Sequence, residues 1–192
     1  MKERPILFSG PMVRAILNGS KTQTRRVAKL TANGYVKEPG GHRRWHTADF
    51  DARLACRYGQ PGDRLWVRET WCHIEGGAVY DAAGGLMDSH DPETIYRADR
   101  PHFPGPWRPA IHMPRWASRI ALEVTGVRVE RLHEISEADA IAEGVNNSLH
   151  LPGGRFAREN FAHLWWTING DGSWEANPWV WVVDFRRTEI QR

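Results

Sequence analysis

The segment that most restricts the fold of this chain is residues 119–132, which carry its longest strand pattern. Apolar side chains occupy every second position in both halves of the segment, but the phase slips by one residue at Thr125–Gly126. The alternating residues are Ile120, Leu122, Val124, Val127 and Val129. Such a slip predicts a β-bulge or sharp bend. Bent strands are how small barrels turn their corners.

The other periodic segments are short and include both strand and helix patterns. Strand patterns occupy residues 4–8, 65–71 and 179–185. Helix patterns occupy residues 11–19, 136–144 and 155–167. Short strands mixed with small helices favour an α+β fold over a doubly wound sheet. With the bent strand, they predict a mixed, partly open β-barrel with short flanking helices. Residues 179–185 are apolar on both faces, which predicts a buried strand.

Residues 20–27 (SKTQTRRV) are polar throughout. We expect a turn after Gly19, then an edge strand that contributes nothing to the core. Two longer stretches, residues 29–60 and 73–112, have no clear period and read as insertions in a single domain spanning residues 1–192. Within the second stretch, residues 78–81 and 94–99 are expected to pair as a hairpin.

Composition excludes several classes of protein. Cys56 and Cys72 form no C-x-x-C pair, so neither a thiolate zinc site nor a disulfide framework is expected. His42, His46, His73 and His112 lack metal-ligand spacing, and we predict no metal and no cofactor. No apolar run reaches eighteen residues and the first residues show no signal peptide, which predicts a cytoplasmic protein without a membrane partner.

Charge is distributed unevenly along the chain. Residues 1–69 contain 14 Lys and Arg against 6 Asp and Glu, whereas the net charge of the whole chain is only +3. A basic N-terminal third suits an anionic partner such as RNA, although a solvated basic surface has the same composition. Ten tryptophans are present, and this residue both fills cores and stacks on bases.

Five segments together resemble the ASCH family, named for the activating signal cointegrator-1 homology domain. They are residues 19–26 (GSKTQTRR), 62–69 (GDRLWVRE), 113–119 (MPRWASR), 142–145 (AEGV) and 177–182 (NPWVWV). The third segment is similar to a subgroup often associated with phages and prophages. The resemblance runs from about residue 6 to residue 185 and leaves the two insertions largely uncovered.

The resemblance implies a PUA-like barrel with a cleft that handles a modified nucleobase, a nucleoside or RNA. Some characterised relatives are amidohydrolases that remove the acetyl group from N4-acetylcytidine, and others bind or cleave RNA. The lysine, threonine and glutamate of the amidohydrolases match Lys21, Thr24 and Glu143, which are therefore the candidate catalytic residues. The arginine two residues past the threonine matches Arg26, a candidate for substrate binding.

Those residue types suit amide hydrolysis, which needs a nucleophile, a base and a proton donor for the leaving amine. In one scheme Thr24 attacks the acyl carbonyl and a neutral Lys21, its pKa depressed by burial or by Arg25 and Arg26, takes the proton. Glu143 then passes a proton to N4. In the other scheme water attacks, Glu143 is the base and Thr24 positions the substrate. The alternative without catalysis is that the segment around Lys21 is a polar loop whose lysine is merely solvated.

Four further residues are candidates for substrate binding. Glu69 shares a strand face with apolar neighbours, and a buried carboxylate needs a partner, for which Arg26 or Arg68 would serve. Trp71 and Trp116 could stack on a base, although core packing is the commoner role of tryptophan. Asn146 and Asn147 could read a base edge or simply form the turn after the helix.

Three functions therefore compete. The first is an amidohydrolase of N4-acylated cytosine, supported by the residues that match one by one. The second is a non-catalytic RNA-binding module, or a metal-independent ribonuclease, supported by the basic N-terminal third. The third is a phage accessory protein without catalysis, suggested by the two insertions.

Overall fold

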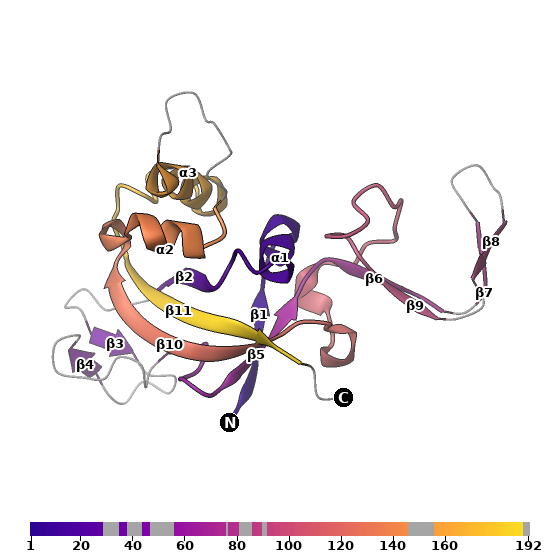
Figure 1. Cartoon of the computed structure of the whole chain (residues 1–192), viewed down its shortest axis with the longest axis horizontal. Helices are drawn as coiled ribbons and strands as arrows, with labels where there is room; N and C mark the ends of the chain where they lie inside the picture. The colour runs from indigo at the N-terminus through magenta and orange to yellow at the C-terminus, as the bar shows by residue number, and fades with distance from the viewer. Residues whose placement is uncertain are drawn as a thin grey trace.

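The computed structural model describes residues 1–28, 35–37, 44–46, 56–75, 77–80, 86–89, 92–145 and 156–189. The chain has an α+β fold built on one five-stranded mixed sheet (Figure 1). The mixed sheet and its helices confirm the expected α+β class. In the described ranges, no helix is both long and apolar enough to cross a lipid bilayer.

The main sheet has the strand order β1-β5-β10-β11-β2. Its strands are β1 (Glu3–Leu7), β5 (Arg64–Arg68), β10 (Ala121–Arg131), β11 (Trp179–Thr188) and β2 (Gln23–Val27). β1 and β5 run parallel, and the other neighbours run antiparallel. β1 and β2 form the two edges, so the sheet is not closed within the described residues. The predicted edge position of residues 20–27 is confirmed.

β10 bends where the sequence pattern slips. Its register against β11 shifts between Val124 and Gly126, as expected for a bulge. A side chain at Gly126 would displace Asp184, because a Cβ atom would lie 2.7 Å from its carboxylate oxygen. The two long strands consequently form the curved ribbon that dominates Figure 1.

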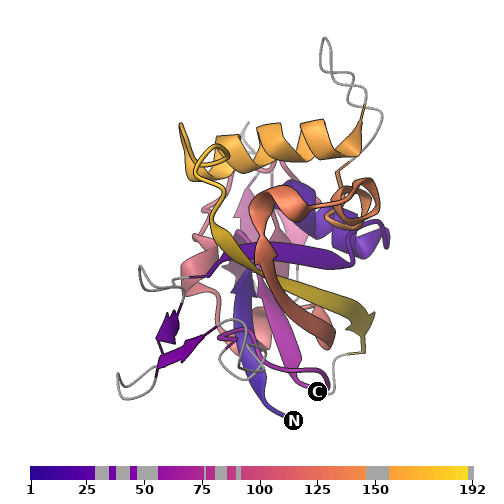
Figure 2. The same ribbon diagram turned by 90° about the vertical axis from the view of Figure 1, so that its left-hand side faces the viewer.

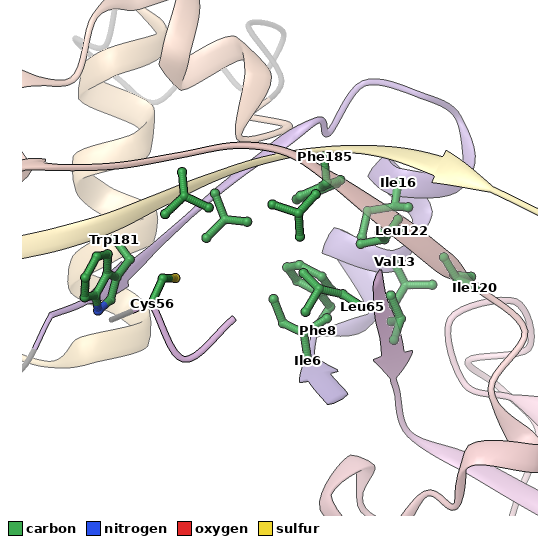
Figure 3. Packing of buried hydrophobic residues seen from close by; sticks show 14 of the residues in the cluster. Ile6, Phe8, Val13, Ile16, Cys56, Leu65, Ile120, Leu122, Trp181 and Phe185 are labelled. Atoms are coloured by element: carbon green, nitrogen blue, oxygen red, sulfur yellow. The ribbon is translucent and has the colours of Figure 1, made fainter. Parts of the chain in front are cut away.

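The buried side chains of β11 divide between two apolar clusters, one on each face of the strand. Trp181, Val183 and Phe185 join the larger cluster, whose residues come mainly from β1, α1, β5 and β10 (Figure 3). Val180 and Val182 face the opposite way and pack with residues of the C-terminal helices. This arrangement explains why residues 179–183 are apolar at successive positions, and it confirms the predicted buried strand.

Three α-helices flank the sheet: α1 (Gly10–Leu17), α2 (Glu137–Ala142) and α3 (Ala157–Asn169). Ser136 caps α2, because its hydroxyl accepts a hydrogen bond from the Asp139 amide at 3.1 Å. Figure 2 shows α3 lying across one end of the sheet, above α2 and β2. Short 3-10 turns are η2 (Ala110–His112), η3 (Arg115–Ala117) and η4 (Leu132–Glu134).

A second group of strands extends away from the main sheet (Figure 1). β6 (Trp71–Ile74) pairs with β9 (Glu93–Tyr96), and β7 (Gly77–Tyr80) pairs with β8 (Leu86–Ser89). The predicted hairpin between residues 78–81 and 94–99 is therefore wrong. The predicted strand 65–71 is also divided, since β5 ends at Arg68 and β6 begins at Trp71 with a different partner.

The first predicted insertion contains one short hairpin, in which β3 (Tyr35–Lys37) pairs with β4 (Arg44–His46). Both predicted insertions also supply core residues. Cys56, Ile95 and Ala98 are buried, and Cys56 and Ala98 belong to the larger apolar cluster. His42, Asn146 and Asn147 lie outside the described residues, as does the side chain of His46.

Candidate functional site

Lys21 and Glu143 are brought together by the ends of two helices. Lys21 follows the turn after α1, and Glu143 is the C-cap residue of α2. Their backbones form an isolated antiparallel bridge, supported by a 2.8 Å hydrogen bond from the Thr22 amide to the Ala142 carbonyl. Gly144 permits this approach, because it has φ 80° and a Cβ atom there would lie 2.9 Å from the Lys21 Cβ.

The Lys21 ammonium is enclosed by three acceptors. Nζ donates to the carbonyl oxygens of Gln23 and Glu143 and to Glu143 Oε2, each at 2.8 Å. Three acceptors match the three protons of an ammonium group, so none remains for Thr24. Burial lowers the pKa of Lys21, and the charges of Arg25 and Arg26 act in the same direction, while Glu143 opposes them.

Arg25 holds the other side of the Glu143 carboxylate. Its Nη1 lies 3.3 Å from Glu143 Oε1, and its Nη2 lies 2.5 Å from Glu130 and 3.4 Å from Asp139. The Arg25 side chain is wholly buried. A guanidinium presents five donors in a fixed plane, so one buried side chain can orient three carboxylates at once. Glu143 is therefore held between two cations.

A second arginine completes this charged network from β10. Arg128 contacts Glu130 at 2.9 Å, Asp139 at 2.8 Å and Asp184 at 3.0 Å. Gln23 on β2 donates to Asp184 at 2.6 Å.

The network explains a correction to the sequence interpretation. Residues 20–27 were expected to contribute nothing to the interior, yet four of their side chains are buried. Partners from β10, β11 and the end of α2 satisfy Lys21, Gln23 and Arg25. The buried residues are Lys21, Gln23, Thr24 and Arg25.

The network should make stability depend on acid pH through Asp139. Burial alone would raise the pKa of Asp139, but hydrogen bonds from Ser136 and Gln23 and the charge of Arg25 lower it from 3.8 to about 2. A lowered pKa stabilises the folded state above the ordinary pKa, and this contribution is lost as pH falls from about 5 towards 2. The shift corresponds to about 2 kcal/mol at neutral pH.

We therefore expect Asp139→Asn to lower the free energy of unfolding by about 2 kcal/mol at pH 7 and by roughly half as much at pH 3. Urea titrations at both pH values measure the difference. Asp171→Asn, at an exposed turn position, is the matched control and should change little at either pH. An equal loss for Asp139→Asn at both pH values would contradict the assigned role.

A cavity of about 360 Å³ opens beside the ion pair. Thr24 and Glu143 line it, together with Arg25 and Arg26. Lys21 does not line the cavity, because it lies behind the Glu143 carboxylate and is almost completely buried. Of the three candidate catalytic residues, Thr24 and Glu143 can therefore touch a ligand directly, while Lys21 contacts Glu143.

Arg26 supplies a cation without a carboxylate partner among the described residues. One of its Nη atoms donates to the Leu7 carbonyl at 2.7 Å, and its guanidinium lies 5.2 Å from the centre of the Phe8 ring. Its Nε is buried and has no hydrogen-bond partner in the described part of the chain. Burial is the main reason that the pKa of Arg26 is lowered. A polar or anionic ligand group in the cavity would satisfy this guanidinium.

The other candidate residues lie elsewhere. Glu69 is buried and paired with Arg119, at 2.9 and 3.1 Å, rather than with Arg26 or Arg68 as predicted. Arg68 donates to the Ile111 carbonyl at 3.1 Å and lies over the Trp66 ring. Neither Glu69 nor Arg68 lines the cavity.

The two candidate stacking tryptophans also lie outside the cavity. Trp71 is 1% exposed and packs in a small cluster with Met113 and Ala117, so its role is core packing. Trp116 is 64% exposed, and its ring meets the Trp71 ring edge-on at 5.6 Å. Its indole is therefore free to contact a ligand, but not one in the cavity beside Glu143.

One wall of the cavity was not anticipated from the sequence. It is an apolar stripe on α3 whose members are Phe161, Leu164, Trp165 and Ile168. Their spacing of three and four residues places them on one helix face. That periodicity was visible in the sequence, but it is typical of a core-facing helix and does not distinguish a core from a cavity wall.

The described residues contain no group of three His, Cys, Asp or Glu side chains that could hold a metal ion. No protein-family model matches the chain. No curated protein matches its sequence significantly. Among solved structures, the chain is similar to protein EF3133 from Enterococcus faecalis V583, assigned to the family model DUF984. The TM-score is 0.44 and the sequence identity 9%, over 100% of this chain and 83% of the other.

Proposed function

We propose that this chain is an amidohydrolase that removes the acyl group from N4-acylated cytosine, as the free base or nucleoside. The observation that carries the proposal is the Lys21–Glu143 ion pair, whose carboxylate borders a cavity also lined by Thr24 and Arg26. The resemblance of residues 19–26 and 142–145 to the ASCH family supports the same activity. Membership of that family, with its PUA-like barrel, is part of the proposal.

Glu143 is the base in the proposed reaction. It takes a proton from water, whose oxygen adds to the acyl carbonyl carbon. The carbon–N4 bond then breaks, Glu143 returns the proton to N4, and the products are the cytosine amine and a carboxylic acid that ionises in solvent. The cations Lys21 and Arg25 fix the orientation of the Glu143 carboxylate, since one contacts each carboxylate oxygen.

Arg26 is the proposed partner of the developing oxyanion. Its guanidinium borders the cavity and has no carboxylate partner within the described ranges, so it is available to a negatively charged oxygen. Preorganised cations and donors directed at such an oxygen are among the largest contributions to catalysis. Tetrahedral intermediates of amide hydrolysis carry their charge there.

Water, rather than Thr24, is the nucleophile that the geometry supports. A threonine nucleophile requires a neutral Lys21 to take its proton, but all three Nζ hydrogen bonds run to oxygens of Gln23 and Glu143. Thr24 then acts by positioning the substrate through its hydroxyl group.

We expect Thr24→Val, which keeps the shape of the side chain, to lower kcat/KM by about tenfold, the effect of one neutral hydrogen bond. Steady-state kinetics with N4-acetylcytosine measure this change. Loss of all detectable activity in a folded Thr24→Val protein would instead identify the threonine as the nucleophile. Thr167→Val, on the exposed side of α3, is the matched control.

The direct test is chromatography of N4-acetylcytosine and N4-acetylcytidine after incubation with the purified protein. We expect conversion to cytosine or cytidine, with release of one equivalent of acetate. Absence of conversion of both compounds and of N4-acylcytosines with longer acyl groups, at enzyme concentrations comparable with substrate, would overturn the proposed function. Salt-sensitive binding of RNA by the same inactive protein would then favour a nucleic-acid-binding module.

A further inference from the structure

The cavity has two chemically different parts. Its polar part carries Thr24, Arg26 and Glu143, and one of its walls is the apolar stripe of α3. Along this stripe, exposure rises from Phe161, which is buried, through Leu164 to Ile168, which is 55% exposed. The apolar wall therefore runs continuously from the buried interior to the opening of the cavity.

The opening is bordered by exposed apolar side chains from three elements. Leu7 of β1 is 40% exposed, Val27 of β2 is 46% exposed and Ile168 of α3 is 55% exposed, and all three line the cavity. Single exposed apolar residues are common on protein surfaces. A group of them around a concave site with a few converging polar groups is typical of a ligand pocket.

We propose that the apolar part of the cavity binds the acyl group of the substrate, and that this group is an aliphatic chain or aromatic ring larger than acetyl. This inference rests on the proposed function, because it assigns the reacting amide to Glu143. With the amide at Glu143, an acyl chain of several carbons would lie along the α3 stripe and extend towards the opening of the cavity. An acetyl group would leave most of this apolar surface in contact with water.

The chemistry of the wall favours the acyl group over a ribose as its occupant. The side chains of Leu7, Val27, Leu164 and Ile168 contain neither donors nor acceptors, so ribose hydroxyls placed against them would lose hydrogen bonds to water without replacement. The polar edge of the cytosine ring also needs hydrogen-bond partners that replace water. Thr24 and Arg26, in the polar part of the cavity, can supply such partners.

The test uses the intact chain and a series of N4-acylcytosines bearing acetyl, butanoyl, hexanoyl and benzoyl groups. We expect kcat/KM to rise by up to about fourfold for each methylene that becomes buried, giving at least about a tenfold advantage of hexanoyl over acetyl. Adding a ribose to the acetyl compound should bring no comparable gain. These measurements need no variant, so they do not depend on the folding of one.

A substitution at the rim locates the effect. Ile168→Asn should remove most of the preference for hexanoyl over acetyl, measured as the ratio of the two kcat/KM values. Ile141→Asn is the matched control, because Ile141 is 48% exposed and does not line the cavity. It should leave the hexanoyl-to-acetyl ratio unchanged.

The outcomes separate this inference from the proposed function. Cleavage of the acetyl compound with no gain from longer chains would overturn the inference and leave the amidohydrolase activity standing. A larger gain from ribose than from the acyl chain would also overturn it. Failure to cleave any of the compounds would overturn the proposed function, and the acyl assignment with it. A preference for hexanoyl that survives in Ile168→Asn would exclude the α3 wall as its cause.

Discussion

Replacement of Glu143 by glutamine should lower kcat/KM for N4-acylcytosine by about 10²- to 10⁴-fold, the usual contribution of a general base. Glutamine has nearly the same shape and keeps one oxygen acceptor for Lys21 Nζ, which now bonds Glu143 Oε2 at 2.8 Å. It cannot accept a proton from water. The variant therefore removes the proposed chemistry while disturbing the surrounding structure as little as a single substitution allows.

Two measurements show whether the loss of activity is specific to the Glu143 carboxylate. Glu175→Gln, at an exposed position after α3, changes the same functional group away from the cavity and should retain full activity. Circular dichroism and thermal unfolding of Glu143→Gln should show that the variant is folded under assay conditions. A folded Glu143→Gln protein with more than about a tenth of the wild-type kcat/KM would remove the carboxylate from the mechanism.

The parts of the fold that were predicted correctly depend on local patterns. The β10 bulge follows from a one-residue slip around Gly126, and the burial of both faces of β11 follows from apolar residues at successive positions. Both signals lie within a dozen residues. The predicted hairpin in the second insertion failed because strand pairing also depends on distant segments. β9 pairs with β6, which immediately follows β5, and local alternation contains no information about that choice.

The candidate site depends even more on contacts between distant segments, which local sequence patterns do not encode. Lys21 and Glu143 are 122 residues apart, and only the resemblance to a known family linked them before the structure brought them into contact. The burial of Arg25 could not be predicted from a polar segment such as SKTQTRRV. A buried charge is tolerated only where its partners converge, and Glu130 lies 105 residues further along the chain. The Glu69–Arg119 pair was missed for the same reason, since nothing local indicates which arginine reaches a buried carboxylate.

Loss of Arg25 should have the largest effect on stability. We expect Arg25→Met to lower the free energy of unfolding by about 3–5 kcal/mol at pH 7. Methionine fills a similar volume, but it leaves Glu143, Glu130 and Asp139 without the guanidinium that contacts all three. The cost arises mainly from carboxylates that remain buried and charged after their partner is removed. Urea unfolding monitored by tryptophan fluorescence measures the change.

The pH dependence and a surface control distinguish this cause from lost packing. Each of the three carboxylates would lose one of its two cationic partners, and protonation relieves that loss. The destabilisation by Arg25→Met should therefore shrink as pH falls from 7 towards 4, whereas a packing defect would persist. Arg186→Met breaks an arginine–glutamate pair of similar length, 2.9 Å to Glu123, in which the arginine side chain is 69% exposed. It should cost less than about 1 kcal/mol, because solvent screens exposed pairs. Similar losses in the two variants would show that burial of the network does not determine its energetic contribution, and the charged cluster would then have no special role in holding Glu143.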